Sequence, residues 1–316
     1  MSSMSYKMQP QATTHIMMIR PVRFGFNEET AESNAFQDAV LAAQTKDRAQ
    51  EDALAEFENM VAQLTAAGVN VITYDDTPEP YTPDSIFPNN WISFHQSGKV
   101  ILYPMQAENR RLERRMDILE DLKNYFQVDE VIDLTHFEKE GKFLEGTGSM
   151  VLDRRYKTAY ACLSPRTHPE VLDAFSEATG FSIVKFNAAD ANGKAIYHTN
   201  VVMCIGDAFA VVCLQAITDP DERLYVREEL EKTGKQVIEI TLEQMNSFAG
   251  NMLLVYNKRG EKLLVMSTQA FESLTAKQRD ELDDYAVLLH SDLSIIETNG
   301  GGSARCMMAE VHLTEK

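Results

Sequence analysis

The sequence is poor in features that mark several common protein classes. It has four cysteines in 316 residues, and no CxxC pair or cysteine–histidine cluster has the spacing of a metal site. Three of them, Cys162, Cys204 and Cys213, lie inside apolar runs, which is typical of buried thiols in a reducing compartment. We therefore expect neither a disulfide framework nor a metal centre.

Long apolar runs and basic charge are also scarce. The longest apolar run, residues 208–217, is too short to span a bilayer, and the opening "MSSMSYKMQPQ" lacks the apolar core of a signal peptide. Lys and Arg number 30 against 48 Asp and Glu, so the formal net charge is −18. Such a surface repels nucleic acids and anionic membranes. We exclude both as partners and expect a cytoplasmic protein.

What the sequence does contain is a loose repeat. Five β-branched runs recur at intervals of roughly 50 to 60 residues. Their central apolar pairs begin at Val71, Val131, Ile183, Val237 and Ile295. Each run precedes a polar loop and a second apolar run, and after four of these a turn leads to a third run. The lengths and the bounding turn residues predict strands and hairpins.

Helical patterns fill the rest of the units. Apolar residues at helical spacing are Leu112, Met116, Leu119, Leu122 and Phe126 in one segment, and Leu54, Phe57, Val61 and Leu64, ended by Gly68, in another. The fifth unit stops after its second strand, "RCMMAEV", and "HIMMIRP" at residues 15–21 supplies the missing strand. A unit shared by both ends of the chain closes a ring.

We therefore predict one α/β domain over residues 1–316. Its fold is a five-bladed, pseudo-symmetric α/β propeller, closed by pairing of the N- and C-terminal strands. The ordered core is expected over residues 14–313, with a flexible segment at residues 1–13. The alternative is a two-domain α/β chain in which the spacing is accidental.

Equivalent loops of such a ring meet at one end of its axis. The loops between the first and second strands carry, in order, Asp84, Glu145, His198, Asn251 and Cys306. A cysteine and a histidine can act as nucleophile and base, and a carboxylate commonly orients the base. Cys306 also follows Arg305 and three glycines, and a cation with exposed backbone N–H groups favours a thiolate. Taken singly, each residue also has a structural explanation, such as a turn carboxylate or an ordinary histidine.

The same segments resemble a known superfamily, that of guanidine-modifying enzymes. "FLEGTGSM" resembles its Glu-Gly-Gly-Asp type motif, "YHTNVV" its His-x-Asp segment, "GGGSARCMM" its cysteine loop and "TPDSIFPNNW" its Asp-bearing loop. Arginine deiminases, dimethylarginine hydrolases and glycine amidinotransferases belong to it and share a five-bladed propeller, the pentein fold. Over residues 14–313 the chain is most similar to the citrulline-utilisation hydrolase branch.

The resemblance implies a role for each matched residue. Cys306 is the expected nucleophile and His198 the general acid and base. Glu145 is the expected carboxylate partner, and Asp84 is expected to bind the terminal nitrogens of the substrate.

The sequence departs from deiminases and amidinotransferases at Asn200, where those enzymes have Asp. A guanidinium cation suits carboxylates, whereas the carbonyl oxygen of a neutral ureido group can accept a hydrogen bond from an amide. Asn200 therefore favours citrulline over arginine as the substrate.

We expect hydrolysis of citrulline to ornithine, ammonia and carbon dioxide through a covalent cysteine intermediate, with no metal or organic cofactor. An arginine deiminase is the main alternative, followed by an amidinotransferase and a non-catalytic binding protein of the same fold. The sequence leaves the oligomeric state open, a homodimer included.

Other arginines are assigned by their context. Arg305, Arg20 and Arg23 are candidates for binding the α-amino and α-carboxylate ends of the substrate. A second group is expected to form a solvated helix face: Arg110, Arg111, Arg114 and Arg115, with Glu108 and Glu113.

Overall fold

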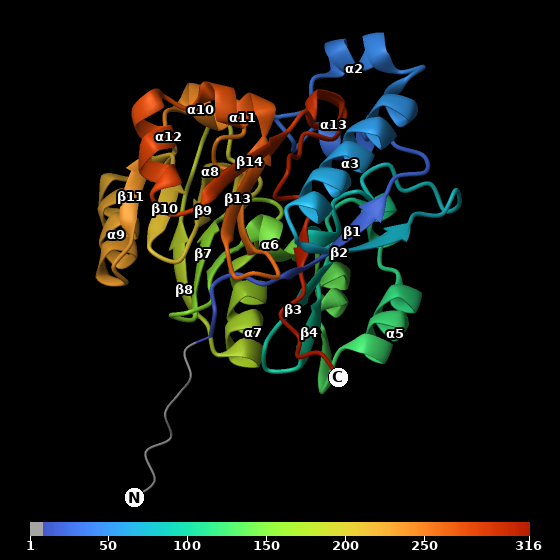
Figure 1. Cartoon of the computed structure of the whole chain (residues 1–316), viewed down its shortest axis with the longest axis horizontal. Helices are drawn as coiled ribbons and strands as arrows, with labels where there is room; N and C mark the ends of the chain where they lie inside the picture. Colours follow the sequence, from blue (N-terminus) through green and yellow to red (C-terminus); the bar gives the residue numbers. More distant parts are fainter. Residues whose placement is uncertain (1–8) are drawn as a thin grey trace, which may run out of the picture.

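The computed structural model describes residues 9–316 (Figure 1). Within them the strands form five sheets of three strands each, in the orders β15-β1-β2, β3-β4-β5, β6-β7-β8, β9-β10-β11 and β12-β13-β14. The strands are β1 (His15–Arg20), β2 (Asn70–Asp75), β3 (Ile92–Phe94), β4 (Lys99–Leu102), β5 (Glu130–Asp133), β6 (Val151–Asp153), β7 (Thr158–Cys162), β8 (Ser182–Phe186), β9 (Met203–Ile205), β10 (Phe209–Val212), β11 (Gln236–Glu239), β12 (Leu253–Tyr256), β13 (Lys262–Ser267), β14 (Val287–Ser291) and β15 (Ala309–Glu310).

Helices connect the strands and cover the sheets (Figure 1). The α-helices of residues 9–316 are α1 (Glu28–Ala31), α2 (Ala39–Thr45), α3 (Ala49–Ala66), α4 (Glu108–Arg111), α5 (Met116–Tyr125), α6 (Gly146–Ser149), α7 (Pro169–Thr179), α8 (Thr199–Val202), α9 (Pro220–Lys232), α10 (Leu242–Asn246), α11 (Thr268–Ser273), α12 (Ala276–Asp283) and α13 (Ser294–Gly300). Three 3₁₀ turns accompany them, η1 (Pro88–Asn90), η2 (Thr135–Glu140) and η3 (Leu214–Ala216). No helix in this part of the chain is both long and apolar enough to cross a membrane.

The predicted repeat corresponds to one supersecondary unit. In four sheets an antiparallel hairpin is followed by helical chain and then by a strand parallel to the middle one, as in β3, β4 and β5. Four of the five β-branched runs are the strands β2, β5, β8 and β11, and each lies at an edge of its sheet. The prediction for the fifth run is wrong, because Ile295 lies in α13, and the edge strand of that sheet is β14, which precedes it.

The fifth sheet contains both ends of the chain. β1 pairs antiparallel with β15, with Met17 opposite Ala309, and parallel with β2 on its other side. The predicted pairing of the terminal strands is confirmed. In consequence, the turn that carries Cys306 leads directly into a strand held by the N-terminal part of the chain.

The packed chain starts earlier than predicted. Part of the expected flexible segment, residues 1–8, lies outside the described residues. Within the remainder, Ala12 is buried, and the buried Gln11 donates from Nε2 to the carbonyl of Leu152 at 2.8 Å. Gln11 also accepts a hydrogen bond from the backbone N–H of Arg154 at 2.8 Å. The core therefore extends at least to Gln11, and the predicted start at residue 14 is corrected.

Candidate active site

Four of the predicted site residues lie in loops that join an edge strand of one sheet to the first strand of the next. Asp84 lies between β2 and β3, Glu145 between β5 and β6, His198 between β8 and β9, and Cys306 between β14 and β15. All four side chains are buried, none more than 3% exposed. The loops thus place the acidic, basic and thiol groups inside the protein.

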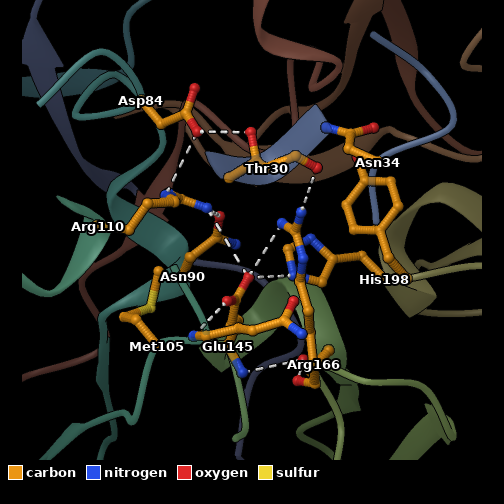
Figure 2. A network of polar contacts seen from close by, with 12 residues as sticks. Thr30, Asn34, Asp84, Asn90, Met105, Arg110, Glu145, Arg166 and His198 are labelled. Atoms are coloured by element: carbon orange, nitrogen blue, oxygen red, sulfur yellow. Dashed lines mark hydrogen bonds and ion pairs between the residues drawn. The ribbon is translucent and has the colours of Figure 1, made fainter. Parts of the chain in front are cut away.

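Glu145 and His198 precede two single-turn helices, α6 and α8, which pack against each other. His198 Nε2 lies 2.8 Å from Glu145 Oε2 (Figure 2). Glycines make this approach feasible, because a Cβ on Gly146 would lie 2.3 Å from the carbonyl oxygen of Asn89. A Cβ on Gly148 would lie 2.8 Å from ring atoms of His198. The sequence "EGTG" is therefore required by close packing at this position.

Burial and neighbouring charges determine the protonation states of Glu145 and His198. Burial would raise the pKa of Glu145, but Arg166, His198 and Arg110 outweigh burial and hold that pKa below its usual range. Burial lowers the pKa of His198 to about 4, against the influence of Glu145. His198 is therefore neutral near pH 7. Since an ionised carboxylate only accepts hydrogen bonds, Nε2 carries the proton and Nδ1 remains as a free base.

Cys306 is held by two asparagine side chains. The Nδ2 atoms of Asn200 and Asn251 each lie 3.3 Å from its Sγ. The backbone N–H of Arg305 donates to Asn251 Oδ1 at 3.0 Å, which fixes the amide with its N–H groups toward the sulfur. Two N–H donors stabilise a thiolate better than a neutral thiol. The fourth loop of the repeat therefore does contribute, through Asn251, which was noted in the sequence but not assigned to the site.

Two acceptor atoms in the site have no hydrogen-bond partner within residues 9–316. They are Asn200 Oδ1 and Asp84 Oδ1, and both are buried. The other oxygen of Asp84, Oδ2, accepts from Asn27 Nδ2 at 2.8 Å. Burial raises the pKa of Asp84, with Arg110 and Asn27 opposing. A buried acceptor without a partner is costly, so these atoms are suited to receive N–H groups of a ligand.

The expected solvated helix face is wrong for Arg110 and Glu113. Arg110 is 2% exposed and binds Glu113 through two hydrogen bonds, at 2.9 Å and 3.0 Å. Its Nη1 donates to Asn90 Oδ1 at 2.9 Å, and its guanidinium lies 3.7 Å from Asp84 Oδ2 and 3.8 Å from Glu145 Oε2. The remaining members are partly or fully exposed: Glu108, Arg111, Arg114 and Arg115.

A second buried arginine, Arg166, was not singled out in the sequence. Its Nη1 lies 3.4 Å from Glu145 Oε2, and its Nη2 donates to the carbonyl of Thr30 at 3.2 Å. Arg110 follows β4 and Arg166 follows β7, so both come after the middle strand of a sheet. Their equivalent positions in the repeat are the signal in the sequence that connects the two arginines.

The segment of residues 27–34 covers the site. It contains α1, and Figure 2 shows Thr30 and Asn34 next to Asp84, Arg166 and His198. Ser33 Oγ accepts from Arg166 Nη2 at 2.6 Å, and Asn34 Nδ2 donates to the carbonyl of Gly300 at 3.2 Å. The covering segment is therefore tied to Arg166 and to the glycine loop.

The other proposed arginines do not reach the site. Arg305 donates to the carbonyl of Met308 and, at 2.8 Å, to Glu310 Oε2. Arg20 forms ion pairs with Glu58 and Asp75. Arg23 pairs with Glu79. These contacts correct the prediction for all three, because their guanidinium groups are engaged elsewhere.

Comparisons with known proteins were made for the sequence and for the structure. A family model described as N,N dimethylarginine dimethylhydrolase, eukaryotic, matches residues 20–313. No curated protein sequence matches the chain. The apo structure of ArgZ, an arginine dihydrolase of the ornithine–ammonia cycle in cyanobacteria, has a TM-score of 0.74 and 16% identity and covers 96% of this chain. The match covers 41% of the ArgZ chain, so this protein spans about two fifths of its length.

Two further structures match along nearly their whole length. The N-terminal domain of ArgZ bound to its substrate has a TM-score of 0.71 at 15% identity, covering 94% of this chain and 97% of that domain. A mutant dimethylarginine dimethylhydrolase from Pseudomonas aeruginosa, complexed with citrulline, has a TM-score of 0.60 at 16% identity and covers 94% and 98%. At these identities the likeness is one of fold.

Proposed function

The chain belongs to the N,N-dimethylarginine dimethylhydrolase family, within the pentein superfamily, and we propose that it is a Cys306-dependent hydrolase of a small ureido or guanidino amino acid. One observation carries the proposal. A buried cysteine with two amide donors shares a site with a neutral histidine that a carboxylate holds at 2.8 Å. This is the arrangement of a nucleophile and a general base.

We propose citrulline as the substrate. The carboxylates Glu145 and Asp84 are already close to Arg166 and Arg110, so little negative charge remains for a guanidinium cation. The polar groups around the sulfur are amides, which match a neutral ureido group. Arginine, as the substrate of a deiminase, is the second candidate. It is favoured by the free acceptors Asp84 Oδ1 and Asn200 Oδ1, which suit a group rich in N–H donors.

Arg110 and Arg166 are the proposed ligands of the substrate α-carboxylate. Both are 2% exposed, and the planar guanidinium can bind a carboxylate through two parallel hydrogen bonds. Asp84 Oδ1 is the proposed acceptor for a substrate nitrogen. This assignment replaces Arg305, Arg20 and Arg23.

The reaction proceeds by covalent catalysis. The Cys306 thiolate attacks the ureido carbon, and the C=O electron pair moves to oxygen. As the sulfur loses its negative charge, the N–H groups of Asn200 are freed to donate to the developing oxyanion. Nδ1 of the neutral His198 first takes the proton that the Cys306 thiol gives up, delivers it to the departing nitrogen, and then takes one from a water molecule that attacks the thioester-like intermediate. The carbamic acid released from the sulfur breaks its remaining C–N bond and loses carbon dioxide. One water is consumed overall, and the products are ornithine, ammonia and carbon dioxide.

The positions of the site residues also support a proposal for the fold. We propose that the five sheets are the blades of one propeller domain, with the loops before β3, β6, β9, β12 and β15 at one end of its axis. The support is that Asp84, Glu145, His198, Asn251 and Cys306, one from each of these loops, are all buried polar or thiol groups.

Product analysis tests the function. Purified protein is incubated with citrulline, with arginine and with dimethylarginine, and ornithine, citrulline and ammonia are measured. We expect ornithine and ammonia from citrulline, no turnover with Cys306→Ser, and retained turnover with Cys213→Ala, a change at a buried cysteine outside the site. Citrulline formed from arginine, with no ornithine from citrulline, would establish a deiminase instead. Full activity in Cys306→Ser would refute the nucleophile.

A further inference from the structure

One buried aromatic side chain at the site has no role in the mechanism above. Tyr197 immediately precedes His198 in the loop between β8 and β9, and it is 3% exposed. Its backbone carbonyl accepts a hydrogen bond from Ser164 Oγ at 2.8 Å, and the centroid of its ring lies 6.1 Å from that of Phe36. Contacts from two other segments of the chain therefore fix the position of Tyr197.

The ring of Tyr197 covers one face of the Arg166 guanidinium. Arg166 Cζ lies 4.7 Å from the centroid of the ring. The N–H groups of a guanidinium lie in its plane, and those of Arg166 contact Glu145, the Thr30 carbonyl and Ser33. An aromatic ring against the face leaves these N–H groups free to bind and restrains the orientation of the plane. Tyr197 therefore determines how Arg166 faces the carboxylate that we propose it binds.

The same ring packs against the proposed general base. The ring centroids of Tyr197 and His198 lie 4.5 Å apart, with an angle of 47° between the planes. The contact between Nε2 and Glu145 fixes one edge of the imidazole, and the tyrosine ring limits rotation of the imidazole about that contact. The direction in which Nδ1 points therefore depends on both neighbours.

The hydroxyl of Tyr197 reaches the loop of the nucleophile. It donates to the carbonyl of Gly301 at 2.5 Å, and no other hydrogen bond to this carbonyl occurs within residues 9–316. Gly301 ends α13 in the left-handed conformation, with φ of +61°. Two residues later, the carbonyl of Ser303 accepts a hydrogen bond from the N–H of Cys306 at 2.9 Å. One buried hydrogen bond thus connects the tyrosine to the turn that holds the sulfur.

We propose that Tyr197 is a positioning residue whose ring orients Arg166 and whose hydroxyl fixes the glycine loop that carries Cys306. This inference rests on the proposed function, because it takes Arg166 as a ligand of the α-carboxylate and Cys306 as the nucleophile. One rigid side chain then sets the distance between the carboxylate end of the substrate and the attacking sulfur. Tyr197 thereby selects ureido amino acids of one chain length.

Two substitutions separate the hydroxyl from the ring. Tyr197→Phe removes only the oxygen and leaves the Gly301 carbonyl without its donor, so kcat for citrulline should fall by about 10-fold while KM stays within about twofold. Tyr197→Leu also removes the aromatic face, so KM should rise by about 10-fold in addition. Tyr103→Phe is the matched control, because it removes another buried tyrosine hydroxyl, 2.6 Å from Ser93 Oγ, and it should leave kcat and KM unchanged.

Binding and chain length give two further measurements. In a Cys306→Ser background, the Kd of citrulline measured by calorimetry should be unchanged by Tyr197→Phe and raised by about 10-fold by Tyr197→Leu. The parent should prefer citrulline to its homologue with one more methylene. This preference, as a ratio of kcat/KM values, should fall by about 10-fold in Tyr197→Phe, because the nucleophile loop is no longer tied to the residue that orients Arg166.

The split between kcat and KM distinguishes positioning from the filling of space. A fully active Tyr197→Phe, or equal changes of kcat and KM in both variants, would overturn the inference. Should Tyr197→Leu not fold by circular dichroism, Tyr197→Met makes the same comparison. Turnover of arginine without turnover of citrulline by the parent would refute the proposed substrate alone. Because arginine carries the same α-carboxylate, the same split in kcat and KM is then expected with arginine, and its absence would overturn the inference.

Discussion

At the scale of single residues, substrate choice depends most on Asn200. Its side chain is buried, with Nδ2 donating to Cys306 and Oδ1 without a partner among the described residues. A carboxylate at this position would replace the donor with a second acceptor and place negative charge against the sulfur. We expect Asn200→Asp to lower kcat/KM for citrulline by about 10 to 100-fold, since an unmatched buried polar group costs about 1–3 kcal/mol.

Ligand binding distinguishes a specific mismatch with the ureido group from a general disturbance of the site. Arginine binding to the same variant, measured by calorimetry, should fall far less than citrulline turnover. Asn246→Asp, an exposed change on α10, is the matched control. An equal loss for both ligands would contradict the selection of the ureido oxygen by Asn200.

Arg110 gives a second prediction at this scale. If it binds the α-carboxylate, Arg110→Met should raise KM for citrulline by about 10 to 100-fold, the size expected for a lost charged hydrogen-bonding group. A ureido compound without a carboxylate should be hydrolysed equally by parent and variant. Arg111→Met, at the less buried neighbour, should leave both substrates unaffected. A loss that is the same for both substrates would assign Arg110 to the support of Asn90 and Glu145 instead.

Some residues of the site could be predicted from the sequence and others could not. Cys306, His198 and Glu145 could be grouped because the repeat placed them in equivalent loops. Arg110 could not be recognised as buried, because four arginines in a charged segment are usually solvated. Its surroundings include Asn90 and Asp84, which come from other loops of the chain.

At the scale of elements, the single-turn helix α6 fixes the geometry of Glu145. Gly146 has φ of +48°, and a Cβ there would also collide with the backbone of Asn89. Gly146→Ala should therefore lower both stability and activity, by more than the roughly 1–2 kcal/mol of left-handed strain alone. Gly193 has φ of +78° and open space around it, so Gly193→Ala should cost about 1 kcal/mol and leave activity intact. Thermal unfolding and citrulline turnover compare the two. Similar effects at both glycines would contradict the packing argument.

The helix α13 carries a pH-dependent element next to the cysteine loop. Burial raises the pKa of Glu297 from its ordinary value to about 7. Between pH 4.5 and 7 the folded protein keeps a proton that the unfolded chain has lost, so this group lowers stability as pH rises. Glu297→Gln abolishes the effect. The free energy of unfolding of Glu297→Gln minus that of the parent should therefore increase by about 1 kcal/mol for each pH unit between pH 4.5 and 7.

Denaturant unfolding at several pH values measures that difference. Glu272→Gln, an exposed change on α11, should show no such trend. A difference between Glu297→Gln and the parent that is constant with pH would show that Glu297 does not hold the proton.

The elements were predicted unevenly. Four edge strands were found from β-branched runs between turn residues. The fifth run begins α13 instead, because Glu56 on α3 accepts hydrogen bonds from the backbone N–H groups of Ile295 and Ile296 and so caps the start of a helix, a contact from a distant part of the chain.

The helix α3 was predicted, but the residues of α3 that face the core differ in part from those predicted. The residues facing the core are Ala53, Phe57, Met60 and Leu64, and the expected Leu54 and Val61 are only partly buried. The larger aliphatic side chains were favoured, whereas the core cluster that Ala53 shares with Ile16 and Met18 accepts an alanine.

At the scale of the whole molecule, the sequence predicted that its ends meet, and β1 pairs with β15. This succeeded because the incomplete fifth unit had one complement elsewhere in the chain. Charge relations across the molecule could not be predicted in the same way. The link between Arg154, in the turn after β6, and Glu310, on β15, depends on how two sheets approach each other.

The pairing of the chain ends makes the nucleophile dependent on the N-terminal strand, which leads to a last prediction. Val311 is 1% exposed, and its N–H donates to the carbonyl of His15 at 2.9 Å. Val311→Pro deletes this donor and leaves a buried carbonyl without a partner, so the free energy of unfolding should fall by about 1–3 kcal/mol. Because the same strand continues from the Cys306 turn, citrulline turnover should fall as well. Val287→Pro is the control, since Val287 is the exposed first residue of the edge strand β14 and proline is tolerated there. Equal losses in the two variants, or full activity in a destabilised Val311→Pro, would show that the terminal pairing holds the chain together without supporting the site.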